Sequence, residues 1–439
     1  MPDGAVVDGI TWRRADLFSG IDCERALAGA DVVYYLVHSM MPSSGLTQAG
    51  FEDMDLILAD NLARAAARGG ARRIVYLGGL VPSDANLSRH LASRLEVEHA
   101  LAGHGVPVTV LRAGLVIGPD GSSFRILERL VRRLPTMILP RWTRQRTQPI
   151  ALDDVLELLV RVTVADAAVG EAVDIGGPEV VTYGELIART AQALGLRRRL
   201  VDVPVANLLL SELWVTGVTG QSRSLVKPLI ESLAHEMVAR DRTVQLALGV
   251  PGQGMDAALA AALAGRSVVA PVSVPRAPAP TDAPRRTVRS VQRMTLPAGR
   301  DATWAARAYL TWLPYFLWPL LRVNEAGHHH RIALRGVGVD LLELTWSPER
   351  STPDRALLYV TGGALARVSD EGRGRLELRT VLDGRVLLAA IHDFEPRLPW
   401  PVYLATQAQG HLAVMAGFRR HLATSRPVEA GGDLVDVEG

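Results

Sequence analysis

The chain has 439 residues, of which 48 are basic and 46 acidic, so its formal net charge is +2. The basic side chains are spread along the sequence, which excludes the concentrated stripe that nucleic-acid binding needs, and we expect no nucleic-acid partner. Cys23 is the only cysteine, which excludes an intrachain disulfide and favours a reducing cytoplasm. The length predicts two domains.

The first part of the chain alternates apolar segments typical of buried strands with amphipathic helices. This rhythm predicts an incomplete doubly wound parallel (Rossmann-like) sheet of the α/β class, with helices on its faces. In chain order we predict a strand over 9–17 that ends at Asp16, a helix over 22–30, a strand over 31–40, a helix over 51–71, a strand over 72–80, a helix over 88–103 and a strand over 106–118.

The pattern changes in the second half of the chain. A helix within 147–164 and a strand and helix within 171–195 continue the first domain, and residues 204–265 are predicted to be mostly helical. The proline- and alanine-rich stretch 268–286 predicts an extended linker. Later strands, predicted over 328–346, 355–368, 374–384 and 385–396, precede a helix over 404–423.

These elements define three regions: a first domain over 1–265, a linker over 266–298 and a smaller α+β domain over 299–430. A terminal helix on a meandering sheet resembles helix-grip folds, so we expect the α+β domain to enclose an apolar ligand beneath residues 403–423.

Residues 304–323 are aromatic-rich and have about the length of a membrane span. Pro314 and Pro319 interrupt the segment, and Arg307 and Arg322 lie close to its ends. We therefore expect a buried or interfacial amphipathic segment, with peripheral membrane contact as the alternative.

The run His328-His329-His330 invites a metal-binding interpretation. Adjacent residues on a strand point to alternating faces, so three adjacent histidines cannot readily bind one ion. We expect no metal site.

Several motifs in order carry a family resemblance: the strand "DVVYYLVHSM", the helix with Asn61, the strand "YLGGL" and the run "TQPIALDDV…DIGGPEVVTYGEL". Over residues 9–265 the chain resembles the atypical short-chain dehydrogenase/reductases, in the branch of NmrA-like proteins, epimerase/dehydratase-like proteins and the complex I NADPH-binding subunit. The resemblance implies an NAD(P)-binding domain with a helical extension on the substrate side, and NADP or NAD as the cofactor.

The resemblance also implies positions for the cofactor. It places Asp16 and Leu17 at the adenine, Asn61 on a structural water, Leu36, Val37, His38 and Ser39 beside the ribose and pyrophosphate, Leu77, Gly78 and Gly79 along the nicotinamide, and Ala113, Leu115 and Val116 at the carboxamide. Each has a simpler alternative: Asp16 caps the next helix, Asn61 bonds its own backbone, and the glycines permit close packing.

The chain departs from this family where a dinucleotide fold begins. No glycine-rich turn lies before Asp31, and the first recognisable strand corresponds to the third strand of the fold. Without the central strand, the segment ending at Asp16 lacks a pairing partner and the strand over 31–40 gains an open edge. We hypothesise an upstream start or a truncated relative, and cofactor binding would be weakened or lost if the chain starts at Met1.

A second departure concerns the catalytic pair. His90 and Arg94 stand where the family has Tyr-x-x-x-Lys, four residues apart on one helix face. A histidine titrates near 6.5 and could donate a proton unaided, although the cation of Arg94 would disfavour imidazolium. In this hypothesis, His90 donates the proton, and Arg94 and His38 orient the cofactor and the substrate.

Two functions follow from these residues. The first is an NAD(P)-dependent oxidoreductase with a degenerate site, which reduces or epimerises an apolar small molecule. The alternative is a non-catalytic cofactor-binding sensor, assembly or scaffold protein that has lost the Tyr-x-x-x-Lys chemistry.

Overall fold

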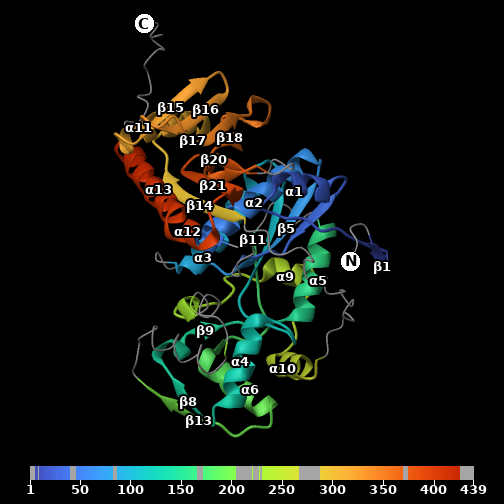
Figure 1. Cartoon of the computed structure of the whole chain (residues 1–439). Coiled ribbons are helices and arrows are strands. Elements are labelled where there is room, and N and C mark those ends of the chain that lie inside the picture. Colours follow the sequence, from blue (N-terminus) through green and yellow to red (C-terminus); the bar gives the residue numbers. More distant parts are fainter. Residues whose placement is uncertain are drawn as a thin grey trace. The chain divides into compact units, whose positions relative to one another are not determined.

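The computed structural model divides into two compact units (Figure 1). The first unit contains Met1–Met41 and Leu58–Ala277, and the second contains Pro42–Ile57 and Pro278–Gly439. The predicted linker over 268–286 and much of the predicted helical region 204–229 lie outside the described residues. The structure describes residues 5–7, 9–39, 46–82, 87–165, 172–203, 220, 227, 230–265, 287–368 and 374–425.

The first unit is built on a four-stranded parallel sheet with the order β11-β6-β5-β3, which confirms the predicted α/β class. Its central strand β5 buries Val75 and Tyr76 completely, because side chains from both faces of the sheet are covered. The strands are β3 (Val32–Tyr35), β5 (Arg73–Gly79), β6 (Val108–Ala113) and β11 (Ala172–Ile175).

Helices pack on this sheet. Val75 belongs to an apolar cluster with Val155 and Leu158 of one helix, whereas the hydroxyl of its neighbour Tyr76 is bonded by Arg94 of another. Because successive strand residues face opposite sides, these two helices cover opposite faces. The helices of this part are α1 (Gly20–Leu27), α2 (Phe51–Arg68, which continues from the second unit), α3 (Arg89–Ala102), α5 (Leu152–Val164) and α9 (Thr243–Ala247).

Strand β3 lies at the edge of the parallel sheet, as the sequence predicts, and no other described strand pairs with its outer side. Tyr34 and Leu36 are 42% and 56% exposed there. The strand predicted over 9–17 is shorter: β2 (Ile10–Trp12) pairs with β1 (Ala5–Val7) in a separate antiparallel hairpin. The chain leaves β2 early and turns where the Asp16 carboxylate accepts the Phe18 N–H at 3.1 Å.

A second apolar cluster of the first unit lies beyond the carboxyl end of β6. Phe124, Val131, Leu186 and Leu259 form its centre. The helix α6 begins with a capping box in which Thr182 and Glu185 bond each other's backbone N–H groups. The elements are β7 (Val116–Ile117), α4 (Ser122–Arg133), β8 (Thr136–Leu139), η1 (Arg141–Arg144), β9 (Arg146–Thr147), β10 (Ile150–Ala151), β12 (Val181–Thr182), α6 (Tyr183–Ala193), β13 (Arg199–Asp202) and α10 (Met255–Leu263).

The second unit is a mixed sheet with the order β15-β16-β17-β18-β20-β21-β14-β4, on which α11 and α13 pack. This arrangement confirms the predicted second α+β domain. Its elements are β4 (Leu46–Gln48), β14 (Val288–Thr295), α11 (Ala302–Phe316), β15 (Leu321–Ala326), β16 (His329–Leu334), β17 (Asp340–Trp346), η3 (Pro348–Arg350), β18 (Arg355–Gly362), β19 (Ala366–Arg367), β20 (Arg375–Val381), β21 (Val386–Pro396), α12 (Trp400–Ala405) and α13 (Gln407–Thr424).

Two boundaries of the predicted second domain are corrected. The stretch predicted as linker up to residue 298 contains β14, which pairs along its length with β21. Residues 42–57 belong to the second unit and not to the first, because β4 pairs in parallel with β14. Both errors have one cause, since the pairing partners lie roughly 100 and 240 residues away along the chain and leave no local pattern.

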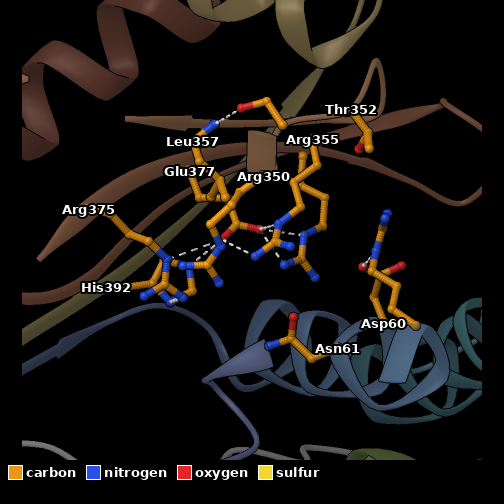
Figure 2. Close-up of polar contacts among 12 residues, drawn as sticks. Asp60, Asn61, Arg350, Thr352, Arg355, Leu357, Arg375, Glu377 and His392 are labelled. Carbon is orange, nitrogen blue, oxygen red and sulfur yellow. Dashed lines mark hydrogen bonds and ion pairs between the residues drawn. The ribbon is translucent and has the colours of Figure 1, made fainter. Parts of the chain in front are cut away.

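A buried charge cluster lies on the β20 face that is opposite to Leu376 and Leu378 (Figure 2). Glu377 is fully buried and accepts hydrogen bonds from Arg355 at 3.0 Å and Arg379 at 2.6 Å. The His392 Nε2 atom lies 3.1 Å from the same carboxylate. Burial alone would raise the pKa of Glu377, but the two arginines hold it well below its ordinary value, so Glu377 is ionised.

The segment 304–323 is amphipathic. Its helical part, α11, buries Ala305, Tyr309 and Leu313 against the sheet, and Trp318-Pro319 is a cis peptide between α11 and β15. The side chains at its end are exposed: Tyr315 by 77%, Phe316 by 43%, Trp318 by 64% and Leu320 by 61%. Within the part of the chain that the structure describes, no helix combines the length and apolar character needed to cross a bilayer.

Aromatic rings pack between α11 and α13, in part of the space that we expected to hold a ligand beneath residues 403–423. The Trp312 ring stacks on Phe316 with centroids 4.5 Å apart and lies 5.4 Å from the Phe418 ring of α13. A Cβ atom on Gly417 would meet Phe316 at 2.7 Å, so α13 is in close contact with α11. A ligand elsewhere beneath residues 403–423 stays a prediction.

Candidate functional site

Helix α3 carries the predicted pair on one face. Its N-cap Ser88 accepts the Leu91 N–H at 3.3 Å, and this start places His90, Arg94 and Glu98 on successive turns. Arg94 and Glu98 are 8% and 6% exposed. The predicted spacing thus brings a histidine, a cation and an acid into a line that runs into the protein.

Arg94 is a buried cation without an ion pair among the described residues. Its Nη1 donates a hydrogen bond of 3.4 Å to the hydroxyl of Tyr76, which is itself fully buried in β5. Glu98 is not available to it, because both of its oxygens accept bonds from Arg112 at 2.6 to 3.2 Å. A buried charge without a counterion lowers the stability of the fold by several kcal/mol. The position of Arg94 therefore suits a ligand that accepts hydrogen bonds.

Two histidines meet beside Arg94. The ring centroids of His38, which follows β3, and His90 are 6.1 Å apart. Burial, Arg94 and His38 together lower the pKa of His90 to about 3. His38 keeps more than a third of its surface in solvent, and partial burial together with Arg94 lowers its pKa to about 4.

Both imidazoles are therefore neutral at pH 7, which corrects the expectation that His90 titrates near its ordinary pKa. The direction of the Arg94 effect is as predicted. A neutral imidazole can still donate one N–H to a carbonyl oxygen, and it does so without a change of charge.

A cavity of about 220 Å³ opens against His90. Most of its lining is apolar, and Tyr183 stays protonated because burial raises its pKa to about 12. The cavity is lined by Gly79, His90, Leu91, Ala113, Gly114, Leu115, Ser123, Ile126, Leu127, Leu130, Trp142, Tyr183, Leu186, Ile187, Ile230, Ser232, Leu233 and Met237. Its size and lining suit a small apolar molecule.

Other predicted cofactor residues lie at the carboxyl ends of the parallel strands. Leu36, Val37 and Ser39 follow β3, and Leu77 and Gly78 end β5. Ligands of open parallel sheets bind at this edge. Cofactor contacts at these positions stay predictions.

The backbone at Ala113, Leu115 and Val116, where β6 ends, already makes hydrogen bonds within the protein. The carbonyl oxygens of Ala113 and Leu115 accept N–H groups of Leu80 at 3.1 Å and Ile150 at 3.0 Å. Each oxygen keeps a second lone pair, so a cofactor carboxamide could still bond there.

Asp16, Leu17 and Asn61 form a separate group of contacts. The buried Asn61 amide donates to the Leu17 carbonyl at 2.9 Å (Asn61 is labelled in Figure 2), and Asp16 stabilises its own turn. Both side chains have local roles, but not the simpler ones that the sequence suggested: Ser19 rather than Asp16 caps α1, and Asn61 bonds the backbone of Leu17 rather than its own. Their roles toward adenine and a bound water stay predictions.

The two glycines that end β5 differ. A Cβ atom on Gly78 would lie 3.0 Å from the Tyr76 ring and 3.3 Å from the Glu98 carboxylate, so Gly78 permits close packing. A Cβ atom on Gly79 would meet only ordinary contacts, with Arg94 Cγ at 3.7 Å, and Gly79 lines the cavity.

Sequence reasoning missed Tyr76, Trp142, Tyr183, Ser232 and Met237. Tyr76 could have been found, because it lies two residues before Gly78 and so shares its strand face. Ser232 and Met237 gave no signal, since they come from a distant segment that closes the cavity.

The residues around Arg94 and the cavity fit the nicotinamide half of a dinucleotide. A buried cation without an ion pair among the described residues, an apolar cavity wall and Gly79 lie together at the strand ends, where the nicotinamide and its ribose bind in this kind of fold. On the pyrophosphate side, the described turn between β2 and α1, residues 13–19, contains no glycine. That turn does not supply the glycine-rich phosphate cradle of the fold.

No protein-family model matches the chain. It is 23% identical over 131 residues to the auxiliary protein GraX of Staphylococcus aureus. The aligned residues make up 30% of this chain and 42% of GraX. It is 22% identical over 205 residues to the mitochondrial NADH-ubiquinone oxidoreductase 40 kDa subunit of Neurospora crassa, covering 45% of this chain and 53% of the subunit. The chain thus spans about half of these curated relatives or less.

Among solved structures, the NADPH-dependent quinone oxidoreductase QOR2 of Escherichia coli in complex with NADPH aligns over 57% of this chain and 83% of its own, with 18% identity and a TM-score of 0.46. The triphenylmethane reductase of Citrobacter sp. in complex with NADP(H) aligns over 58% of this chain and 84% of its own, with 14% identity and a TM-score of 0.45. The similarity to the complex I subunit supports the branch that the sequence resembles.

Proposed function

We propose that the first unit binds NADPH or NADH and reduces or epimerises a small apolar molecule held in the 220 Å³ cavity. One observation carries the proposal: a buried guanidinium, that of Arg94, has no ion pair among the described residues and lies beside two neutral histidines. Of the two histidines, His90 is the more buried, and it lines the apolar cavity.

Arg94 would bind the cofactor. Its guanidinium has donors left after the bond to Tyr76, and these suit the hydroxyls of the nicotinamide ribose. Leu36 to Ser39, Gly79 and Ala113 to Val116 would surround the remainder of that half. The cofactor, when bound, supplies the hydride.

His90 would position the substrate. Its neutral imidazole donates an N–H to the substrate carbonyl and polarises it, as neutral histidines do in other enzymes that act on carbonyls. Hydride transfer to the carbon leaves a negative charge on the carbonyl oxygen, which takes its proton from the solvent that reaches the two histidines at the exposed His38. His38, which keeps contact with solvent, orients His90 and the substrate. The apolar wall excludes water from the reacting carbon.

The test is a binding and turnover experiment on the full chain. NADPH and NADH are titrated by nucleotide fluorescence, and turnover is measured with a panel of apolar ketones, aldehydes and quinones. We expect His90→Ala to lower kcat at least 100-fold, whereas His99→Ala, an exposed histidine on the same helix, should change it less than twofold. Equal activity of the two variants would refute the role of His90.

A specific observation also favours the non-catalytic alternative. Neither histidine titrates near neutral pH, and of the cavity-lining residues Tyr183 has its pKa raised, so no described lining group is tuned for proton transfer at pH 7. Tight NADPH binding with no turnover on any substrate of the panel would favour this sensor or scaffold function.

We further propose that the protein acts in the cytoplasm, with peripheral membrane contact through residues 304–323 as the alternative. The exposed aromatic side chains of Tyr315 and Trp318 support that contact, because such rings suit the interfacial region of a bilayer.

A further inference from the structure

The second unit contains a groove with a volume of about 760 Å³. Neither the proposed cofactor site nor the proposed catalytic residues use it. It lies between the C-terminal half of α11 and the strands β15 to β17. Its volume is within the range of about 300–1,000 Å³ that is typical of small-molecule sites. It is lined by Arg307, Leu310, Thr311, Pro314, Tyr315, Trp318, Arg322, Val323, Glu325, Gly327, His328, His330, Arg335, Trp346 and Pro348.

Three arginines line this groove, against one carboxylate, Glu325. The guanidinium of Arg335 lies over the Trp318 ring at 4.2 Å, and its Nε donates to the Leu321 carbonyl at 2.7 Å. In the described part of the chain, none of the three arginines has an ion pair. The groove therefore has an excess of positive charge that an anion would balance.

His330 provides an independent observation that points to a ligand. It is 6% exposed and lines the groove, and its Nδ1 has no hydrogen-bond partner among the described residues. Burial also lowers its pKa, so the ring is neutral and can donate one N–H. Buried polar atoms are seldom left unbonded, so a polar atom of a ligand is expected there.

The remainder of the lining is apolar and aromatic. Leu310, Pro314, Val323 and Trp346 form a wall beside His330, and the exposed Tyr315 extends it outward. A ligand that satisfies the whole groove must therefore combine an anionic end with an apolar body.

We propose that this groove binds a small amphiphilic carboxylate. The carboxylate accepts hydrogen bonds from Arg307, Arg322 and the Nδ1–H of His330, and the apolar body packs on Leu310, Val323 and Trp346. The site is in the second unit and does not rest on the proposed reductase function. The exposed rings of Tyr315 and Trp318 line the same groove.

The test uses the full chain and isothermal titration with sodium decanoate below its micelle concentration. The uncharged 1-decanol has the same chain and isolates the contribution of the carboxylate. We expect decanoate to bind at least tenfold more tightly than decanol. Equal affinities, or no binding of decanoate, would overturn the proposal.

Matched variants locate the site. Arg307→Gln with Arg322→Gln should weaken decanoate binding at least tenfold, and both side chains are exposed, so folding is preserved. Arg331→Gln with Arg397→Gln removes the same charge from exposed positions of the same unit outside the groove and should leave the affinity unchanged. Equal loss in the two double variants would overturn the proposal.

A final measurement separates a free ligand from a lipid bilayer. Sedimentation with phosphatidylglycerol vesicles should recover little protein if the groove takes a free carboxylate. Recovery with vesicles, abolished by the Arg307/Arg322 double substitution and accompanied by no decanoate binding, would replace the proposed ligand with an anionic membrane surface.

Discussion

The Arg94 guanidinium donates to the Tyr76 hydroxyl at 3.4 Å, and this neutral oxygen is its one described hydrogen-bond partner. One turn along the same helix, Glu98 and Arg112 form a buried two-point ion pair. The helix thus carries one compensated and one uncompensated buried charge. This contrast distinguishes a ligand-binding residue from a structural one.

Replacing the two arginines by methionine should therefore have opposite effects. Arg94→Met removes a buried charge that has no counterion, so urea unfolding should show stability unchanged or raised by about 1 kcal/mol. Arg112→Met leaves Glu98 buried and unpaired, and stability should fall by about 3–5 kcal/mol. NADPH affinity should be lost in Arg94→Met; a large loss of stability in that variant would mean that Arg94 is structural.

The two depressed histidine pKa values predict how stability depends on pH. Unfolding returns His38 and His90 to a pKa near 6.5, so below that pH the unfolded chain binds more protons than the folded one. Their stabilising effect is complete above about pH 6.5 and is lost as the pH falls toward 3 to 4.

Urea midpoints at pH 7.5, 6 and 5 measure this effect. The wild-type midpoint should fall across the series, and the double substitution His38→Gln/His90→Gln should flatten the fall. His99→Gln, at an exposed position, serves as the control. An unchanged slope in the double variant would show that the histidines are not held neutral.

The buried carboxylate of Glu377 should be essential to the second unit. Glu377→Gln removes the anion between Arg355 and Arg379, so we expect a loss of about 3–5 kcal/mol in the free energy of unfolding. Glu349→Gln, at an exposed position, should stay within about 0.5 kcal/mol of the wild type. Comparable values for the two variants would contradict the role of Glu377.

The two glycines of β5 allow a steric test. Gly78→Ala places a methyl group against Tyr76 and Glu98 and should cost about 1–3 kcal/mol. Gly79→Ala meets no close atom and should leave stability within about 0.5 kcal/mol while weakening NADPH binding. Unchanged NADPH affinity in Gly79→Ala would remove Gly79 from the proposed site.

The sequence predicted the features that depend on local pattern. The apolar runs at 72–80 and 106–118 became β5 and β6, and the i, i+4 spacing placed His90 and Arg94 on one face. What it could not predict depends on distant partners. The pKa of His90 is lowered chiefly by burial, which comes from tertiary packing and leaves no trace in the residues around position 90.

The same limit applies to the cavities. The apolar site beside His90 is completed by Ser232 and Met237, roughly 140 residues further along the chain. In the second unit, Trp312 and Phe418 pack together in part of the expected ligand space, and the observed groove lies on another part of α11. Hydrophobic periodicity shows that a face is buried, but it does not show whether a side chain or a ligand covers it.

The pairing of β4 with β14 has a practical consequence for anyone who divides this gene. A clone that starts after the proline-rich stretch would encode β14 without the three residues that hydrogen-bond to its outer side. The resulting fragment would present a bare strand capable of recruiting neighbouring copies, so insoluble expression of such a fragment would reflect the cut rather than the sequence it contains.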